Sequence, residues 1–167
     1  MPTSKSQAAQ SPASAAAQAA EPDRSRVVAR LSTTYVLRSL QLAATVHDGD
    51  ILLTVLAYSI MAANVAHLDN NRVEGSRYET ADDIPPDEER RPVSIQALSR
   101  SLGLPFETTR RYANRLIAKG WCKRVRGGVI VPSAAVASQA NAAAIAANIA
   151  HVRTFLRALK RVGVVAD

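Results

Sequence analysis

One stretch of the sequence limits the fold more than any other, because residues 51–68 contain no Asp, Glu, Lys or Arg. A helix that is apolar on every side has to leave water, so it either spans a membrane or lies in a protein interior. Four polar residues interrupt the run: Thr54, Ser59, Asn64 and His67. Acidic residues flank both ends, and no excess of Lys or Arg nearby orients a span. We therefore expect a buried core or dimer helix, with a membrane span as the alternative.

A second helix is expected before this run. Residues 24–46 place apolar side chains at helical spacing, which predicts a helix with a broad buried face. The break at residues 47–50 contains Asp48 and Asp50, either of which can cap the helix that follows. Residues 24–68 are therefore expected to supply the helical core and dimerisation helices.

The predicted C-terminal helix, residues 133–163, carries an apolar seam whose steps alternate between four and three residues. The seam consists of Ile145, Ile149, Val152, Leu156 and Leu159. A heptad-like seam on a small chain predicts a subunit interface, so we expect a homodimer. A helix that packs on its own domain gives the same pattern, and this interpretation stays open.

Two polar segments lie outside the predicted helices. Residues 1–23 lack the apolar stretch of a secretory signal and are expected to form a disordered tail. Residues 69–92 are acidic, contain Pro85-Pro86 and are expected to form a solvated linker. Because this linker is long for a compact domain, an acidic flap that competes for a basic surface is a second interpretation.

Positive charge is concentrated between residues 93 and 132. This segment carries eight Lys and Arg residues against the single acid Glu107, and the whole chain has a net charge of +7. A basic surface indicates a polyanionic partner, usually nucleic acid or a membrane surface.

The same segment has the pattern of two short helices joined by a turn. Ser94 can cap the first helix, Gly103 supplies the turn that ends it, and Pro105 suits the first turn of the second. One side of the second helix is apolar. The other side carries Glu107, Arg110, Arg111 and Asn114. Because Arg pairs with guanine and Asn with adenine in the major groove, this side is a candidate reading surface. Thr108, near the helix start, can reach a phosphate or a thymine methyl group.

A β-hairpin is predicted directly after these helices. Residues 121–126 alternate in polarity, Gly127-Gly128 can form a turn, and residues 129–131 are apolar. Val93 can supply a short third strand beside them. The basic side chains expected to point outward or lie at the tip are Lys123, Arg124 and Arg126. We expect these side chains to contact phosphate groups.

This order of elements, residues 92–132, resembles the winged helix-turn-helix of bacterial transcriptional regulators of the MarR, IclR and GntR kinds. The resemblance rests on the hairpin and on residues 95–98, 102–104, 107–111, 114–116 and 119–121. It implies that residues 105–115 enter the major groove and that residues 123–128 form a wing on the backbone or minor groove. The implied DNA contacts are Phe106, Glu107, Thr108, Arg110, Arg111, Asn114, Arg115, Lys123, Arg124 and Arg126.

Together these patterns predict a mainly α protein with a small β-hairpin wing, in which the winged helix-turn-helix is flanked by long N- and C-terminal helices. The expected function is sequence-specific binding of double-stranded DNA by a homodimeric transcriptional regulator. The single cysteine, Cys122, fits a reducing compartment, and we expect a cytoplasmic protein.

Other function classes are less well supported by the sequence. It has no Gly-rich phosphate loop, no Ser/His/Asp order and no Cys/His spacing typical of zinc, so no enzymatic activity, cofactor or metal is expected. The alternatives are a winged-helix adaptor that binds protein, and a regulator tethered to a membrane by residues 51–68. A small-molecule effector stays open, but no residue set identifies one.

Overall fold

The computed structural model describes residues 23–69, 76–80 and 82–164. The expected tail, residues 1–23, therefore lies outside the described residues except for Asp23, as does part of the expected linker. The chain is mainly helical with one small antiparallel sheet, as the sequence predicts. In chain order, the elements are α2 (Ser25–Ala44), η1 (Thr45–His47), α3 (Ile51–Asp69), η2 (Ser76–Tyr78), η3 (Asp87–Glu89), α5 (Ile95–Leu102), α6 (Phe106–Ala118), β1 (Lys123–Val125), β2 (Gly128–Ile130), α7 (Ser133–Val136) and α8 (Gln139–Arg161).

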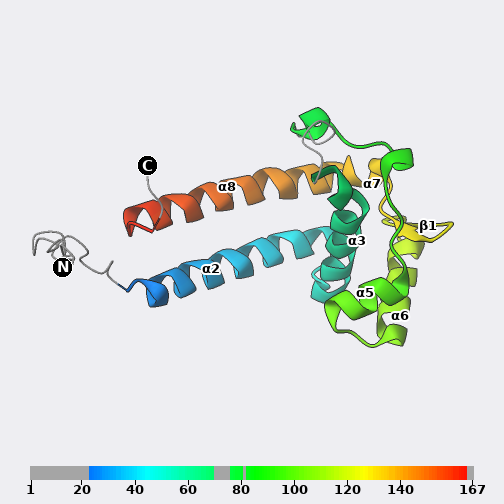
Figure 1. Cartoon of the computed structure of the whole chain (residues 1–167), viewed down its shortest axis with the longest axis horizontal. Coiled ribbons are helices and arrows are strands. Elements are labelled where there is room, and N and C mark those ends of the chain that lie inside the picture. The colour runs from blue at the N-terminus through cyan, green and yellow to red at the C-terminus, as the bar shows by residue number, and fades with distance from the viewer. Residues whose placement is uncertain (1–22, 70–75, 81, 165–167) are drawn as a thin grey trace, which may run out of the picture.

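The chain is arranged as a body and an arm (Figure 1). The body contains α3, α5, α6, α7 and the two strands. The arm consists of α2 and α8, which lie side by side along most of their length and project away from the body. The chain enters at the tip of the arm along α2 and returns to the tip along α8, so the two helices are antiparallel.

Helix α3 is the central helix of the body. Its residues Leu53, Leu56 and Ile60 are fully buried and belong to one apolar core with side chains of α5, α6 and β2. Full burial of one such side chain contributes about 1.5–3 kcal/mol, which explains the apolar sequence on this side of the helix. By length and composition alone, residues 51–68 could also cross a membrane. The packing supports the interpretation of the uncharged run as a core helix.

A sharp turn separates the arm from α3, and we call residues 45–50 the joint. Asp48 adopts a left-handed conformation with φ of 55°. Of the two candidate capping residues, Asp50 is the one that caps α3, because its carboxylate accepts the N–H of Leu53 at 3.0 Å. The left-handed residue and the cap together end one helix and start the next within a few residues.

The expected continuous C-terminal helix is in fact divided into α7 and α8. The hydroxyl of Ser138 accepts the N–H of Asn141 at 3.4 Å and caps α8, so a new helix begins there. The Asn141 amide then donates to the carbonyl of Val136 at 2.8 Å across the bend. In the sequence, Ser138 lies one heptad before Ile145 and can be taken for a small residue of the apolar seam. The sequence therefore does not reveal the break between α7 and α8.

Residues 85–91 of the expected acidic linker pack on the body and are not a free loop. Arg90 is buried and donates to the carbonyl of Pro85 at 2.9 Å. Asp87 accepts the N–H of Ser133 at 2.7 Å and forms an ion pair with Lys123. These contacts fix residues 85–91 beside the strands.

Candidate nucleic-acid interface

Helices α5 and α6 are joined by a tight turn, and the predicted local signals are in place. The Ser94 hydroxyl accepts the N–H of Ala97 at 3.1 Å and caps α5. Gly103 has a φ of 64°, a conformation that a residue with a β-carbon adopts only at a cost. The Ser99 hydroxyl donates to the carbonyl of Leu104 at 2.7 Å and holds the turn closed. The direction in which α6 leaves this turn is therefore fixed by local contacts.

Helix α6 has a buried side and an exposed side. Thr109, Ala113 and Leu116 are fully buried in the body. The exposed side carries Glu107, Arg110, Arg111, Asn114 and Arg115. Thr108 is half-buried, and Phe106 at the start of the helix is 48% exposed. Every predicted contact residue of this helix therefore reaches the surface at least in part.

The three arginines of α6 differ in how they are held. Arg110 donates three hydrogen bonds of 2.8–3.2 Å to the carboxylate of Glu107, one turn earlier. Arg115 forms an ion pair of 2.9 Å with Asp50 of the joint. Arg111 forms no ion pair with any residue that the structure describes. Its guanidinium is the one in this helix that can meet an anion without first losing a carboxylate.

The C-terminal end of α6 is tied to the joint. Lys119 forms an ion pair of 2.7 Å with Asp48, and its hydrogen bond holds the pKa of that carboxyl below its usual value. The ring of Trp121 meets the buried ring of His47 edge-on, with centroids 4.6 Å apart. Burial lowers the pKa of His47, and the charge of Lys119 acts in the same direction. The exposed helix is thus held in a defined orientation to the arm.

Strands β1 and β2 form the predicted hairpin, with Arg124 opposite Val129. Val93 adds a single bridge to Val129 through two backbone hydrogen bonds of 3.0 and 3.1 Å, in place of a full third strand. Gly128 is required at this crossing, because a β-carbon there would lie 2.2 Å from the carbonyl oxygen of Val93. The bridge fixes the hairpin to the start of α5.

The basic residues of the hairpin are exposed in different surroundings. Lys123 is paired with Asp87, and its hydrogen bond is the main cause that lowers the pKa of that carboxyl. Arg124 donates to the side-chain oxygen of Asn114 at 3.0 Å. Arg126 forms no ion pair with any of the described residues. The bond between Arg124 and Asn114 makes the exposed side of α6 and the hairpin one continuous surface.

Sequence reasoning missed two residues that hold this hairpin in place. The amide of Asn64 on α3 donates to the carbonyls of Arg91 and Val129 at 2.7 and 3.2 Å and accepts the N–H of Val131 at 2.9 Å. Its signal in the sequence is a lone amide inside an uncharged run. Asp87 has no local signal, because its partners come from other parts of the chain.

The arm is a second basic surface. Residues 24–44 contain four arginines, residues 139–161 contain three arginines and one lysine, and neither segment contains an Asp or Glu. The fold places these two segments side by side (Figure 1). In residues 93–132, by contrast, four of the cations are paired with acids. The positive charge is therefore shared between two surfaces and is not confined to residues 93–132.

The predicted dimer seam divides between two environments. Its exposed members are Ile145, Ile149 and Leu156. Val152 is half-buried and Leu159 is buried within the single chain. Leu159 therefore contributes to the packing of one chain. Ile145 and Ile149 also line a pocket with Ile84 and Val136 of the same chain, and they are only partly covered there.

The chemistry that this geometry offers is recognition of an anion by a helix and a hairpin. Among residues 23–69, 76–80 and 82–164, no group of three His, Cys, Asp or Glu side chains is placed to hold a metal ion. Burial raises the pKa of the Cys122 thiol to about 12, so the thiol stays protonated at neutral pH. No family model, curated protein or solved structure matches the chain.

Proposed function

We propose that this chain is a winged helix-turn-helix regulator of transcription that binds double-stranded DNA. The observation that carries the proposal is the exposed row of Arg110, Arg111 and Asn114 on α6, which continues through Arg124 into the basic hairpin. An α-helix fits the major groove of B-DNA, where arginine and asparagine read base edges. Helix α6 takes that position, and the hairpin lies on the backbone or in the minor groove.

The contacts of each side chain suggest its part in binding. Arg111 is the first candidate for a base contact, because it has no carboxylate to give up. Asn114 accepts from Arg124 through its oxygen, which leaves the amide nitrogen to donate to a base. Lys123 and Arg126 supply contacts to phosphate, which are independent of sequence and sensitive to salt.

We further propose that the protein acts as a homodimer through one face of the arm. Thr34 of α2 and Thr154 of α8 line a pocket along one side of the arm. Val36 lies two residues after Thr34, and Leu156 lies two residues after Thr154. Two residues turn an α-helix by about 200°, so both side chains point to the side of the arm opposite the pocket. Ile149 lies two residues before His151, another residue that lines the pocket, and therefore also points away from the pocket. Val36, Ile149 and Leu156, which we call the apolar face, are all exposed.

A second copy fits the apolar face better than other occupants do. The three residues of the face are uncharged, and a two-fold axis pairs each surface with itself, so two such faces are complementary. Arg153 and Lys160 line the same shallow pocket as Leu156, so these two long side chains border the apolar face and can extend past it to solvent. A dimer of this kind would present two α6 helices to half-sites about one helical turn of DNA apart.

Selection of bound fragments from a genomic library, followed by mobility-shift titration of the best fragment, tests the proposal. Arg111→Ala should weaken binding to that fragment by about 1–3 kcal/mol. Arg26→Ala removes the same charge from an exposed position on the arm and should weaken binding less. If no sequence is enriched, or if both variants bind like the wild type, the assignment of α6 as the reading helix is wrong.

Phe106 favours a second candidate function, that of a protein-binding adaptor. A large aromatic side chain that is 48% exposed at the start of a helix is the type of residue that anchors protein interfaces. An adaptor would bind DNA weakly and without sequence preference. In that case Phe106→Ser would abolish capture of a protein partner and leave DNA binding unchanged.

A further inference from the structure

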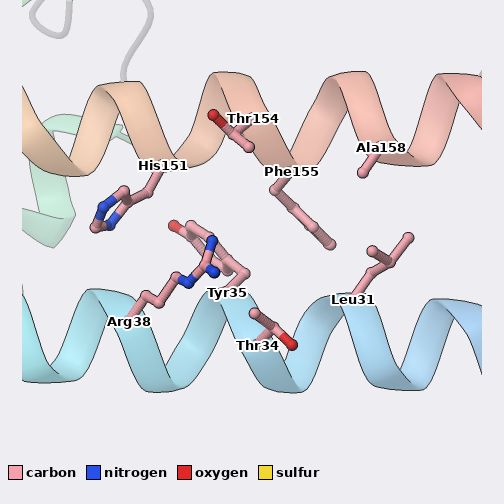
Figure 2. A pocket seen from close by; sticks show the side chains of 8 residues that line it. All are labelled: Leu31, Thr34, Tyr35, Arg38, His151, Thr154, Phe155 and Ala158. Atoms are coloured by element: carbon pink, nitrogen blue, oxygen red, sulfur yellow. The ribbon is translucent and has the colours of Figure 1, made fainter.

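A pocket of about 110 Å³ lies between α2 and α8, on the side of the arm opposite the apolar face. Figure 2 shows side chains from both helices reaching into it. The residues that define its chemistry are Leu31, Tyr35, Arg38, His151, Thr154 and Phe155. None of them belongs to the surface proposed to bind DNA.

The middle of the pocket is aromatic. The rings of Tyr35 and Phe155 are stacked, with centroids 5.0 Å apart and planes 13° from parallel. Leu31 and Ala158 continue the apolar wall toward the tip of the arm (Figure 2). Because the two rings face each other, a planar apolar group that enters here would replace water along their edges and against Leu31 and Ala158.

The end of the pocket nearer the body is polar and cationic. Arg38 and His151 both lie at this end (Figure 2). Residues 24–46 and 133–164 contain no Asp or Glu, so no carboxylate of the arm helices is available to Arg38. A guanidinium that faces a pocket without an acid can take a carboxylate with two hydrogen bonds.

His151 supplies an independent reason to expect a ligand at the same end. Its Nδ1 atom is buried and has no hydrogen-bond partner. A buried polar atom without a partner is uncommon in proteins and costs free energy, so a small turn of the imidazole toward a hydrogen-bonding ligand in the pocket would be favourable. Thr154, in contrast, is satisfied by donating to the carbonyl of Ala150 at 2.9 Å.

From these contacts we infer that the pocket binds a small aromatic carboxylate. The carboxylate pairs with Arg38 and meets the imidazole of His151, and the ring lies against Tyr35 and Phe155. A pocket of about 110 Å³ that is partly open can hold part of a single ring but not a larger ring system. The inference goes beyond DNA binding and does not depend on it.

The test uses the full chain and benzoate as the probe, followed by amide NMR spectroscopy. Benzoate should shift the signals of residues 31–38 and 151–158. Arg38→Gln, at an exposed position, should weaken its binding by about tenfold or more, because a charge-assisted hydrogen bond is lost. Arg30→Gln is the matched control, since it removes an equal charge from the same helix outside the pocket, and it should bind benzoate like the wild type. Benzamide, which lacks the charge, should bind more weakly than benzoate.

Three results would overturn the inference. The first is no shift of these signals at millimolar benzoate. The second is an equal loss of affinity in Arg38→Gln and Arg30→Gln, which would show only attraction of an anion to a basic arm. The third is equal binding of acetate and benzoate, which would exclude a role for the stacked rings. Because none of these measurements involves DNA, failure of the proposed DNA binding would leave them unaffected.

Discussion

The backbone N–H of Val131 donates to the side-chain oxygen of Asn64 at 2.9 Å, across 67 residues of sequence. The same side chain donates to the carbonyls of Arg91 and Val129 at 2.7 and 3.2 Å. One amide on the core helix therefore satisfies backbone groups in β2, in the residue just after β2 and in the segment before α5. The position of the hairpin beside α6 depends on this residue.

We expect Asn64→Leu to destabilise the fold by about 3 kcal/mol or more, because three backbone groups lose their partner and buried groups without one are costly. The free energy of unfolding in urea measures the effect. Gln41→Leu makes a similar change at an exposed position of α2 and should leave the stability nearly unchanged. A loss in Asn64→Leu no larger than in this control would show that the amide does not hold the hairpin.

The ion pair between Asp87 and Lys123 leads to a prediction about DNA affinity. Asp87→Asn keeps an acceptor for the N–H of Ser133 but releases the lysine, which can then contact phosphate. We expect tighter DNA binding and a salt dependence whose logarithmic slope is steeper by about 0.9, the value for one added phosphate contact. Glu88→Gln removes the same charge from an exposed neighbour. Equal slopes for the two variants would mean that only the net charge matters.

The local parts of the candidate interface can be predicted from the sequence, because each has its own signal. Ser94 caps α5, Gly103 forms the turn, and Gly127-Gly128 forms the hairpin. The exposed row on α6 follows from helical periodicity once its start at Pro105 is known. These features depend on residues close together in the chain, so they can be inferred without any knowledge of packing.

The arm and the ion pairs cannot be predicted in this way, because they join distant segments. Nothing near Tyr35 indicates that its ring will stack on Phe155, and without that pairing the second basic surface and the pocket are not apparent. The pairing of Lys119 with Asp48 is equally hidden, since segment charges alone suggest a free lysine. The break before α8 is hidden for a different reason. Ser138 lies seven residues before Ile145, so the sequence allows it either to continue the apolar seam or to cap a new helix.

The apolar face leads to a prediction about the oligomeric state. We expect Leu156→Arg to convert the dimer into a monomer, because a buried arginine without a partner is costly at a subunit interface. Val36→Arg, on the other helix of the face, should do the same. Ala143 lies six residues before Ile149, which turns it about 120° away from the face around α8, so Ala143→Arg should remain dimeric. Sedimentation velocity measures the mass, and a monomeric wild type would contradict the proposal.

The last prediction concerns pH and the joint between arm and body. Burial lowers the pKa of His47 from its usual value of 6.5, with Lys119 acting in the same direction and Asp48 and Asp50 opposing it. Both ring nitrogens are buried without partners, so a proton would leave a buried charge beside Trp121 that Asp48 and Asp50 offset only in part. The unfolded chain therefore binds this proton more readily. The free energy of unfolding should fall as the pH falls below 6.5 toward the lower folded pKa.

His47→Phe keeps an aromatic ring against Trp121 but removes the titrating group, so its stability should depend less on pH between about pH 7.5 and pH 5.5. The paired carboxylates do not interfere in this window, because the pKa values of Asp48 and Asp87 lie below the usual value of 3.8. The fluorescence of Trp121, the single tryptophan, follows unfolding at the joint itself. If the slopes of the wild type and His47→Phe coincide, protonation of this imidazole does not weaken the contact between the joint and α6.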